Sequence, residues 1–263
     1  MSKMIAVTGK GGVGKTAVTA LAVDTLVRAG QKPLLAVDAD PNLNLDAALG
    51  VHAEQTVGGI RENVVDGDEQ ETAGMTKPEF LDYRIQMSIV EASGFDLIAM
   101  GRPEGPGCYC FANEILRDVL GKLARRYSIV VVDCEAGLEH LSRRTTGDVD
   151  LLLAVTDPSV RGMQTCRRAI DLLEEVRTSA ADIRVVLNRV RGDIPDALAE
   201  AAEDLGLEFS IRLPEDENLR TLDALGRPLT ELSDDNPFRG AIEELLADCG
   251  LIDPAEIPVS HNG

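Results

Sequence analysis

A segment near the start of the chain, residues 9–16 with the sequence Gly-Lys-Gly-Gly-Val-Gly-Lys-Thr, constrains the fold more than any other feature. Its glycines allow successive backbone N–H groups to turn inward and bind an anion, and a following helix adds its positive N-terminal end. An apolar run, 4–8, precedes the segment, and a helical pattern covers 15–29. A strand, this loop and a helix in that order match the phosphate-binding pattern G-x-x-x-x-G-K-[ST]. The sequence therefore predicts a nucleotide-hydrolysing site, with a simple glycine-rich turn as the alternative.

The rest of the chain alternates short β-branched runs with helical segments, which is typical of a parallel sheet covered by helices on both faces. We expect a doubly wound α/β fold with a mainly parallel seven-stranded sheet, in a single domain over residues 1–263. An acidic, glycine-containing stretch near 52–77 has poor periodicity and is interpreted as an insertion around short helices, outside the core. The expected strands are 4–8, 33–38, 95–100, 129–133, 151–156, 183–188 and 208–213.

Charge limits the partners that such a chain can have. Lys and Arg total 26 against 45 Asp and Glu, and the net charge of -19 repels nucleic-acid backbones and anionic lipid. We therefore expect no nucleic acid and no membrane as partners. With no leader-like start and no apolar run of bilayer-spanning length, a cytoplasmic location is expected. Five irregularly spaced cysteines do not resemble a secreted disulfide framework and suggest thiols or metal ligands.

The loop and the end of the fourth expected strand predict the contacts to phosphate and magnesium. Lys15 is expected to reach the β- and γ-phosphates, and the Thr16 hydroxyl to bind magnesium. Asp133, which ends the strand 129–133, is expected to hold the same ion through water, unless it is an ordinary strand-terminal aspartate. The predicted contacts of the loop itself come from Gly11, Gly12, Val13, Gly14, Lys15, Thr16 and Ala17.

With its additional lysine at position 10, the loop resembles the deviant Walker A motif of the MinD, ParA and nitrogenase iron-protein class of P-loop NTPases. The resemblance implies nucleotide-sandwich homodimers in which Lys10 reaches the phosphates of the opposite subunit and stabilises charge during phosphoryl transfer. An idle surface lysine is the alternative. The resemblance also implies hydrolysis of ATP to ADP and phosphate, with magnesium as cofactor.

Three further segments resemble parts of this class. Residues 38–42 (Asp-Ala-Asp-Pro-Asn) resemble its switch I, which implies a water-activating carboxylate at Asp40 and places Asp38 near the magnesium shell; a plain turn is the alternative. The sequence does not separate the roles of these two carboxylates. Residues 135–137 resemble switch II, where the Gly137 amide senses the γ-phosphate.

Adenine is expected at the ends of the last two strands, because relatives hold the base there. The positions concerned are Asn188, Arg189 and the run Pro214-Glu215-Asp216. The Asn188 carboxamide offers both a donor and an acceptor, as an adenine edge requires, but a turn-forming asparagine would look the same.

A Cys-x-Cys pair follows the third expected strand. The thiols of Cys108 and Cys110 point to one side if the segment is extended, and a nearby helix N-terminus would favour the metal-binding thiolate form. Two buried cysteines packed as apolar groups are the alternative. One chain supplies two sulfurs, and a two-fold dimer would supply the four that a tetrahedral site needs. Thiolate ligands suit zinc, copper(I), iron–sulfur clusters or square-planar nickel, so the ligand type does not identify the metal.

The sequence around these cysteines resembles that of a narrower family, the CooC-type nickel-insertion ATPases that mature carbon monoxide dehydrogenase. The resemblance covers nearly the whole chain and rests on residues 100–110, 38–42, 133–144 and 213–216. It implies that Cys108 and Cys110 bridge two subunits through Ni²⁺ or Zn²⁺, and that ATP hydrolysis is coupled to nickel delivery to the dehydrogenase catalytic subunit. One departure is Cys134, where asparagine is common in relatives; we expect a core thiol there. A MinD/ParA-like positioning ATPase and an iron–sulfur carrier or reductase resembling the nitrogenase iron protein are the competing functions.

Overall fold

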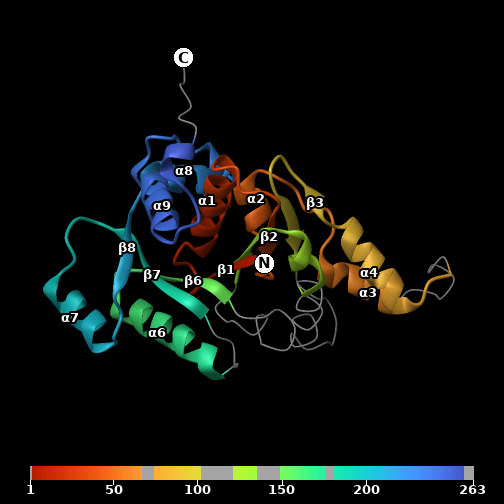
Figure 1. The fold of residues 1–263 in the computed structure, drawn as a ribbon. Coiled ribbons are helices and arrows are strands. Elements are labelled where there is room, and N and C mark those ends of the chain that lie inside the picture. Colours follow the sequence, from red (N-terminus) through yellow and green to blue (C-terminus); the bar gives the residue numbers. More distant parts are fainter. Residues whose placement is uncertain (1, 67–73, 102–120, 135–148, 176–179, 258–263) are drawn as a thin grey trace, which may run out of the picture.

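Parallel strands form the centre of the molecule, in the order β3-β4-β2-β5-β1-β6-β7-β8 (Figure 1). The computed structural model describes residues 2–66, 74–101, 121–134, 149–175 and 180–257. Within these ranges every strand pairing is parallel except that of β3 with β4. The strands are β1 Lys3–Gly9, β2 Leu34–Asp38, β3 Val90–Glu91, β4 Asp96–Ala99, β5 Ile129–Asp133, β6 Val149–Thr156, β7 Ala180–Val190 and β8 Phe209–Pro214.

The mainly parallel α/β fold is confirmed, but the predicted number of seven strands is wrong. All seven expected strands are present, and β3 is an eighth, antiparallel at the edge of the sheet. It spans only Val90–Glu91, which is too short to show the two-residue alternation that identifies a strand in a sequence. Short antiparallel edge strands are common on otherwise parallel sheets.

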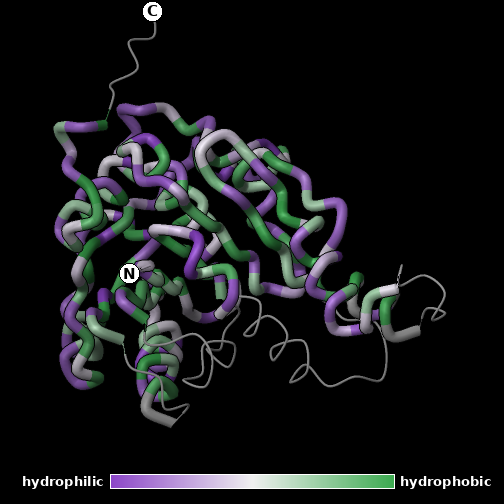
Figure 2. The backbone as a smooth tube through the Cα atoms, turned by 45° about the vertical axis from the view of Figure 1, so that its right-hand side comes forward, coloured by the Kyte–Doolittle hydropathy of each residue, from purple (hydrophilic) through white to green (hydrophobic). Residues whose placement is uncertain are grey.

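Helices cover both faces of the sheet, and the sheet separates the buried residues into two cores. The helices are α1 Lys15–Arg28, α2 Leu45–Leu49, α3 Val57–Asp66, α4 Lys77–Met87, α6 Val160–Glu175, α7 Asp196–Asp204, α8 Glu217–Ala224 and α9 Pro237–Asp248. Side chains of α1, α2, α8 and α9 pack with Ile5 and Val7 of β1, whereas those of α3, α4, α6 and α7 pack with Met4 and Ala6. The strand residues are correspondingly hydrophobic through the middle of the molecule (Figure 2).

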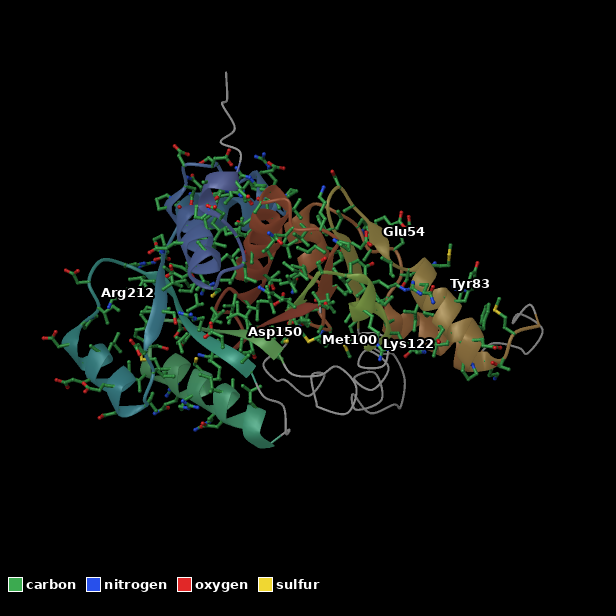
Figure 3. All side chains as sticks on the ribbon, in the orientation of Figure 1. Glu54, Tyr83, Met100, Lys122, Asp150 and Arg212 are labelled. Carbon is green, nitrogen blue, oxygen red and sulfur yellow. The ribbon has the colours of Figure 1, made fainter. Side chains whose placement is uncertain are left out.

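The stretch near 52–77 contributes to the core, contrary to the expectation. It does contain a short helix, α3, but Val57, Ile60 and Val64 of this helix are buried in one of the two cores. The glycines and acidic residues obscured an apolar stripe with the i, i+3, i+7 spacing of a helix face. With α4, this helix extends from one end of the sheet (Figure 1), and Tyr83 of α4 lies far out along it (Figure 3).

No helix in the described ranges is both long enough and apolar enough to cross a bilayer.

A largely buried ion pair joins two long helices of the fold, α1 and α9. Arg239 of α9 is 1% exposed; it donates to the carboxylate of Asp24 on α1 and to the carbonyl oxygens of Thr230 and Leu232. A buried guanidinium without a carboxylate partner carries a large desolvation cost. The pair therefore holds α9 against α1, the helix that follows the phosphate-binding loop.

We expect Asp24→Ala to lower the free energy of unfolding by about 2–4 kcal/mol, because it leaves the Arg239 cation buried without its counter-charge. Urea unfolding followed by circular dichroism measures this loss. Asp171→Ala is the matched control: its ion pair with Arg167 lies on the surface of α6, and its removal should cost less than about 1 kcal/mol. Equal effects of the two substitutions would contradict the structural role of the buried pair.

Candidate nucleotide site

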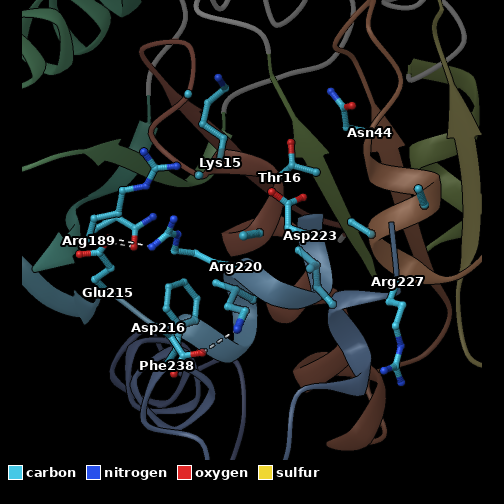
Figure 4. Close-up of a pocket in the computed structure, with 18 of the residues that line it drawn as sticks. Lys15, Thr16, Asn44, Arg189, Glu215, Asp216, Arg220, Asp223, Arg227 and Phe238 are labelled. Carbon is cyan, nitrogen blue, oxygen red and sulfur yellow. Dashed lines mark hydrogen bonds and ion pairs between the residues drawn. The ribbon is translucent and has the colours of Figure 1, made fainter. Parts of the chain in front are cut away.

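A cavity of about 630 Å³ opens at the carboxyl ends of the parallel strands, where ligands bind in sheets of this kind (Figure 4). Four structural units form its walls: the loop 9–16 with the start of α1, the segment after β2 together with α2, the end of β7, and the segment from β8 through α8 to α9. Its lining consists of Gly11, Gly12, Gly14, Lys15, Thr16, Ala17, Asp40, Asn42, Asn44, Ala47, Ala48, Asn188, Arg189, Pro214, Glu215, Asp216, Leu219, Arg220, Asp223, Gly226, Arg227, Leu229 and Phe238.

The phosphate-binding loop has the backbone geometry that an anion nest requires. Gly12 and Gly14 have φ values of 80° and 92°, in the left-handed region that favours glycine, and Gly14 caps the N-terminus of α1. Lys15 is 8% exposed, and its Nζ lies 3.4 Å from the Lys10 carbonyl oxygen. Val13, predicted as a nucleotide contact, has its side chain in the core, so only its backbone is available to a ligand.

Lys10 itself is exposed and does not belong to the described lining of the cavity. Its side chain is therefore free to extend outward from the loop.

Hydroxyl and carboxylate oxygens meet beside the loop. Thr16 Oγ1 donates a 2.7 Å hydrogen bond to Asp133 Oδ2, and Thr19 Oγ1 lies 3.3 Å from Asp133 Oδ1. Asp38 is the register neighbour of Asp133 across β2 and β5, and both carboxylates are buried. Hydroxyl and carboxylate oxygens are the ligands that magnesium prefers, so Thr16 and Asp133 fit a magnesium ion, as the sequence suggested.

Burial changes the acidity of this pair. It raises the pKa of Asp38 from 3.8 to about 6, and repulsion from Asp40 adds to the rise; hydrogen bonds from the Leu45, Asp40 and Asn44 N–H groups partly offset it. Burial likewise raises the pKa of Asp133 from 3.8 to about 7, with the Asp38 charge adding to the rise and the Thr16 hydroxyl opposing it. Two adjacent desolvated carboxylates are unfavourable without a cation, and a divalent ion would offset their repulsion.

Asp38 and Asp40 have different surroundings, which the sequence did not separate. Asp38 Oδ1 accepts from the Asp40 N–H at 3.1 Å, and Oδ2 accepts from the Asn44 and Leu45 N–H groups at 3.0 Å each. Asp38 thus shapes the segment that follows β2. Asp40 is half-buried in the cavity wall, and its Oδ1 accepts from both nitrogens of Asn42. Of the two, Asp40 has the carboxylate that lines the cavity.

The predicted adenine positions Asn188, Arg189 and Pro214 all line the cavity, and Arg189 lies on the side away from Asn44 (Figure 4). Arg189 is exposed and adopts a positive φ of 60° where β7 ends. Asn188, however, is 3% exposed, and its carboxamide is already bonded within the protein: Nδ2 donates to the Val13 carbonyl oxygen at 2.8 Å and Oδ1 accepts from the Arg189 N–H at 2.8 Å.

Glu215 and Asp216, which directly follow Pro214 and were also expected beside the adenine, line the same cavity. Asp216 caps α8 by accepting from the Leu219 N–H at 2.7 Å, and Glu215 pairs with Arg191 and lies 3.9 Å from Arg220 (Figure 4). The Asp216 cap just before a helical pattern was a readable signal. Sequence reasoning missed the lining residues further along α8 and α9, which carry no such signal because tertiary packing alone turns them towards the cavity.

Three predicted site residues lie outside the described ranges: Cys108, Cys110 and Gly137. Among the described residues no cluster of three or more His, Cys, Asp or Glu side chains could hold a metal ion. Cys134 is buried in the core, as expected, and Cys166 is buried there too. The bridging metal site therefore stays a prediction.

Asp133→Asn should stabilise the protein free of nucleotide and magnesium at pH 8. A carboxyl with a raised native pKa favours the folded state only while protonated, so its contribution is complete below pH 4 and is lost as the pH rises through about 7. The neutral amide avoids this loss, and we expect a gain on the order of 2–4 kcal/mol at pH 8 that shrinks towards zero near pH 4. Chemical unfolding with a chelator present measures it; a gain that does not depend on pH would contradict the buried charge of Asp133 as its cause.

Comparison with known proteins identifies the family. The model of the CobQ/CobB/MinD/ParA nucleotide binding domain (CbiA) matches residues 4–229. An uncharacterized ATP-binding protein of Methanocaldococcus jannaschii is 44% identical over 245 residues, covering 92% of this chain and 96% of the relative. The carbon monoxide dehydrogenase accessory protein CooC of Rhodospirillum rubrum is 32% identical over 231 residues, covering 77% of this chain and 88% of the relative.

Solved structures agree on the fold. The septum site-determining protein MinD of Pyrococcus horikoshii, complexed with Mg-ADP, superposes with a TM-score of 0.68 at 20% identity, over 94% of this chain and 96% of MinD. Together with the loop geometry and the buried carboxylates, the family match confirms the predicted enzyme class. The chain therefore belongs to the CobQ/CobB/MinD/ParA family of nucleotide-binding domains and is an ATPase.

Proposed function

We propose that this ATPase is a metallochaperone that delivers nickel to the catalytic cluster of carbon monoxide dehydrogenase, and that ATP-dependent homodimerisation controls metal binding and release. The similarity to CooC of Rhodospirillum rubrum and the Cys-x-Cys pair support this proposal. In it, Cys108 and Cys110 from each of two subunits hold one nickel or zinc ion through four thiolates.

The observation that carries the proposal is that residues 100–110, here called the cysteine segment, start from a residue bonded to the nucleotide site. Met100, directly after β4, donates its N–H to the Asp38 carbonyl oxygen at 2.8 Å and accepts from the Gly58 N–H of α3 at 2.9 Å. Its position beside the sheet is visible in Figure 3. The main chain of Asp38, whose carboxylate shapes the loop bearing Asp40, is thus bonded to the residue from which the cysteine segment starts.

Chain length limits how far the thiols can lie from this point. Gly101 has a φ of 65° and packs so closely on Thr56 that a Cβ there would lie 2.5 Å from the Thr56 side chain. Cys108 follows Gly101 by seven residues, so their Cα atoms are at most about 25 Å apart. A shift of the segment after β2 on ATP binding would therefore act on the start of the cysteine segment.

In the proposed ATPase cycle the residues of the site have separate tasks. Lys15 and the loop N–H groups bind the phosphates, Thr16 and Asp133 hold the magnesium ion, and Asp40 orients the attacking water. Magnesium would neutralise charge on the phosphates and on the buried carboxylates. Lys10 of one subunit would stabilise the transition-state charge in the site of the other, and the Gly137 amide would sense the γ-phosphate.

A MinD- or ParA-like positioning ATPase is the second candidate, favoured by the structural similarity to MinD. In that case ATP-driven dimers would bind an anionic membrane or DNA. The net charge of -19 opposes both surfaces. Sedimentation of the ATP-loaded protein with anionic vesicles, and its gel shift with duplex DNA, separate this candidate from the metallochaperone.

The variant with both Cys108→Ala and Cys110→Ala should lose stoichiometric nickel binding in equilibrium dialysis but keep ATP binding, because the thiolates are the proposed ligands and the nucleotide cavity is formed elsewhere. Cys249→Ala, at a half-buried thiol on the far end of α9, is the control and should keep its nickel. Unchanged metal content in the double variant would remove the bridging site. A brown cluster chromophore in the anaerobically purified protein would favour an iron–sulfur carrier instead.

Lys15→Ala and Lys10→Ala should each lower ATP hydrolysis at least about 100-fold, since each removes a cation from the developing charge. If Lys10 acts across the dimer, a mixture of the two variants regains activity, because the mixed dimer contains one site with both lysines. Lys77→Ala, on the exposed start of α4, is the control for surface charge. A mixture that stays inactive, although mixed dimers form, would contradict catalysis across the interface.

A further inference from the structure

Asn188 connects two parts of the ATPase site that are far apart in the sequence. It ends the buried part of β7 and lines the cavity where adenine was expected. Its Nδ2 nevertheless donates to the carbonyl oxygen of Val13 in the phosphate-binding loop at 2.8 Å. The side chain is 3% exposed. Asn188 is thus placed to act on the loop and not only on a base.

The orientation of the carboxamide is fixed from both ends. Oδ1 accepts from the Arg189 N–H at 2.8 Å, which leaves Nδ2 directed at Val13. A flipped amide would place a donor against the Arg189 N–H and an acceptor against the Val13 carbonyl, so both bonds would be lost. One N–H of Nδ2 and one lone pair of Oδ1 remain for other partners.

The loop and Asn188 also fit closely in space. A Cβ added at Gly14 would lie 2.4 Å from Asn188 Nδ2, nearer than two unbonded atoms can approach. Gly14 also has a φ of 92°. Glycine at this position thus allows the left-handed turn and the close approach of the asparagine.

Peptide planarity gives this contact a consequence for phosphate binding. The Val13 carbonyl and the Gly14 N–H belong to one trans peptide and point in opposite directions. While Asn188 holds the Val13 oxygen, the Gly14 N–H points away from Asn188 and is available to an anion. Without that bond the peptide is free to rotate, and a carbonyl oxygen turned towards the ligand would repel a phosphate.

We infer that Asn188 is a positioning residue for the phosphate-binding loop: it fixes the Val13–Gly14 peptide and so supports triphosphate binding whatever base is attached. This role concerns the ATPase site alone and does not depend on the proposed nickel function. It differs from the adenine contact expected from the sequence, which would affect base selection instead.

Inorganic tripolyphosphate, which has no base, distinguishes the two roles. Asn188→Leu keeps the side-chain size and adds no charge but removes the donor to Val13. We expect this variant to bind magnesium tripolyphosphate, measured as a competitive inhibitor of ATP hydrolysis, about 3- to 10-fold more weakly, as the loss of one hydrogen bond implies. ATP binding should weaken by the same factor, and the ratio of the KM values for ATP and GTP should stay unchanged.

Asn188→Ala, tested in the same way, covers the case in which leucine is not accommodated; thermal unfolding without ligand verifies that each variant is folded. Unchanged tripolyphosphate affinity in a folded variant would overturn the inference. A changed ATP-to-GTP ratio with unchanged tripolyphosphate affinity would assign Asn188 to base recognition.

Discussion

The parallel register of β2, β5 and β1 is the constraint on which the nucleotide site depends. Asp38 pairs with Asp133 across β2 and β5, and Val7 pairs with Asp133 across β5 and β1, so both carboxylates end level with the start of the phosphate-binding loop. A shift of one residue would turn either carboxylate to the other face of the sheet. The buried strands thus place two acidic groups where a magnesium ion would offset their repulsion.

This arrangement destabilises the protein without a cation but provides a site for one. Burial raises the pKa of both carboxyls, so at neutral pH the protein without a cation holds charges in an environment that disfavours them. Their hydrogen bonds come from the backbone after β2 and from Thr16, whose hydroxyl would also bind the magnesium ion. Magnesium binding would therefore act directly on the contact between Thr16 and Asp133.

Two connections lead outward from the site. Met100 bonds to the Asp38 carbonyl and to α3, so the start of the cysteine segment follows the main chain at the end of β2. On the opposite side Asn188 bonds to Val13, so the end of β7 supports the loop. In each case a backbone carbonyl oxygen accepts a hydrogen bond from a neighbouring element. The two bonds join β2 and the loop to segments that are distant in the sequence.

The sequence by itself determined the fold class, seven of the strands, the phosphate-binding loop and the carboxylates of the site. These features depend on local patterns: glycine spacing, β-branched runs and aspartates at strand ends. Only the tertiary structure showed that Val57, Ile60 and Val64 are core residues, that α8 and α9 complete the cavity, and that the Asn188 carboxamide holds the loop. The strand β3 was too short to carry a pattern. These features arise from contacts between distant segments, and a side chain's partner across such a contact leaves no periodic signal in the sequence.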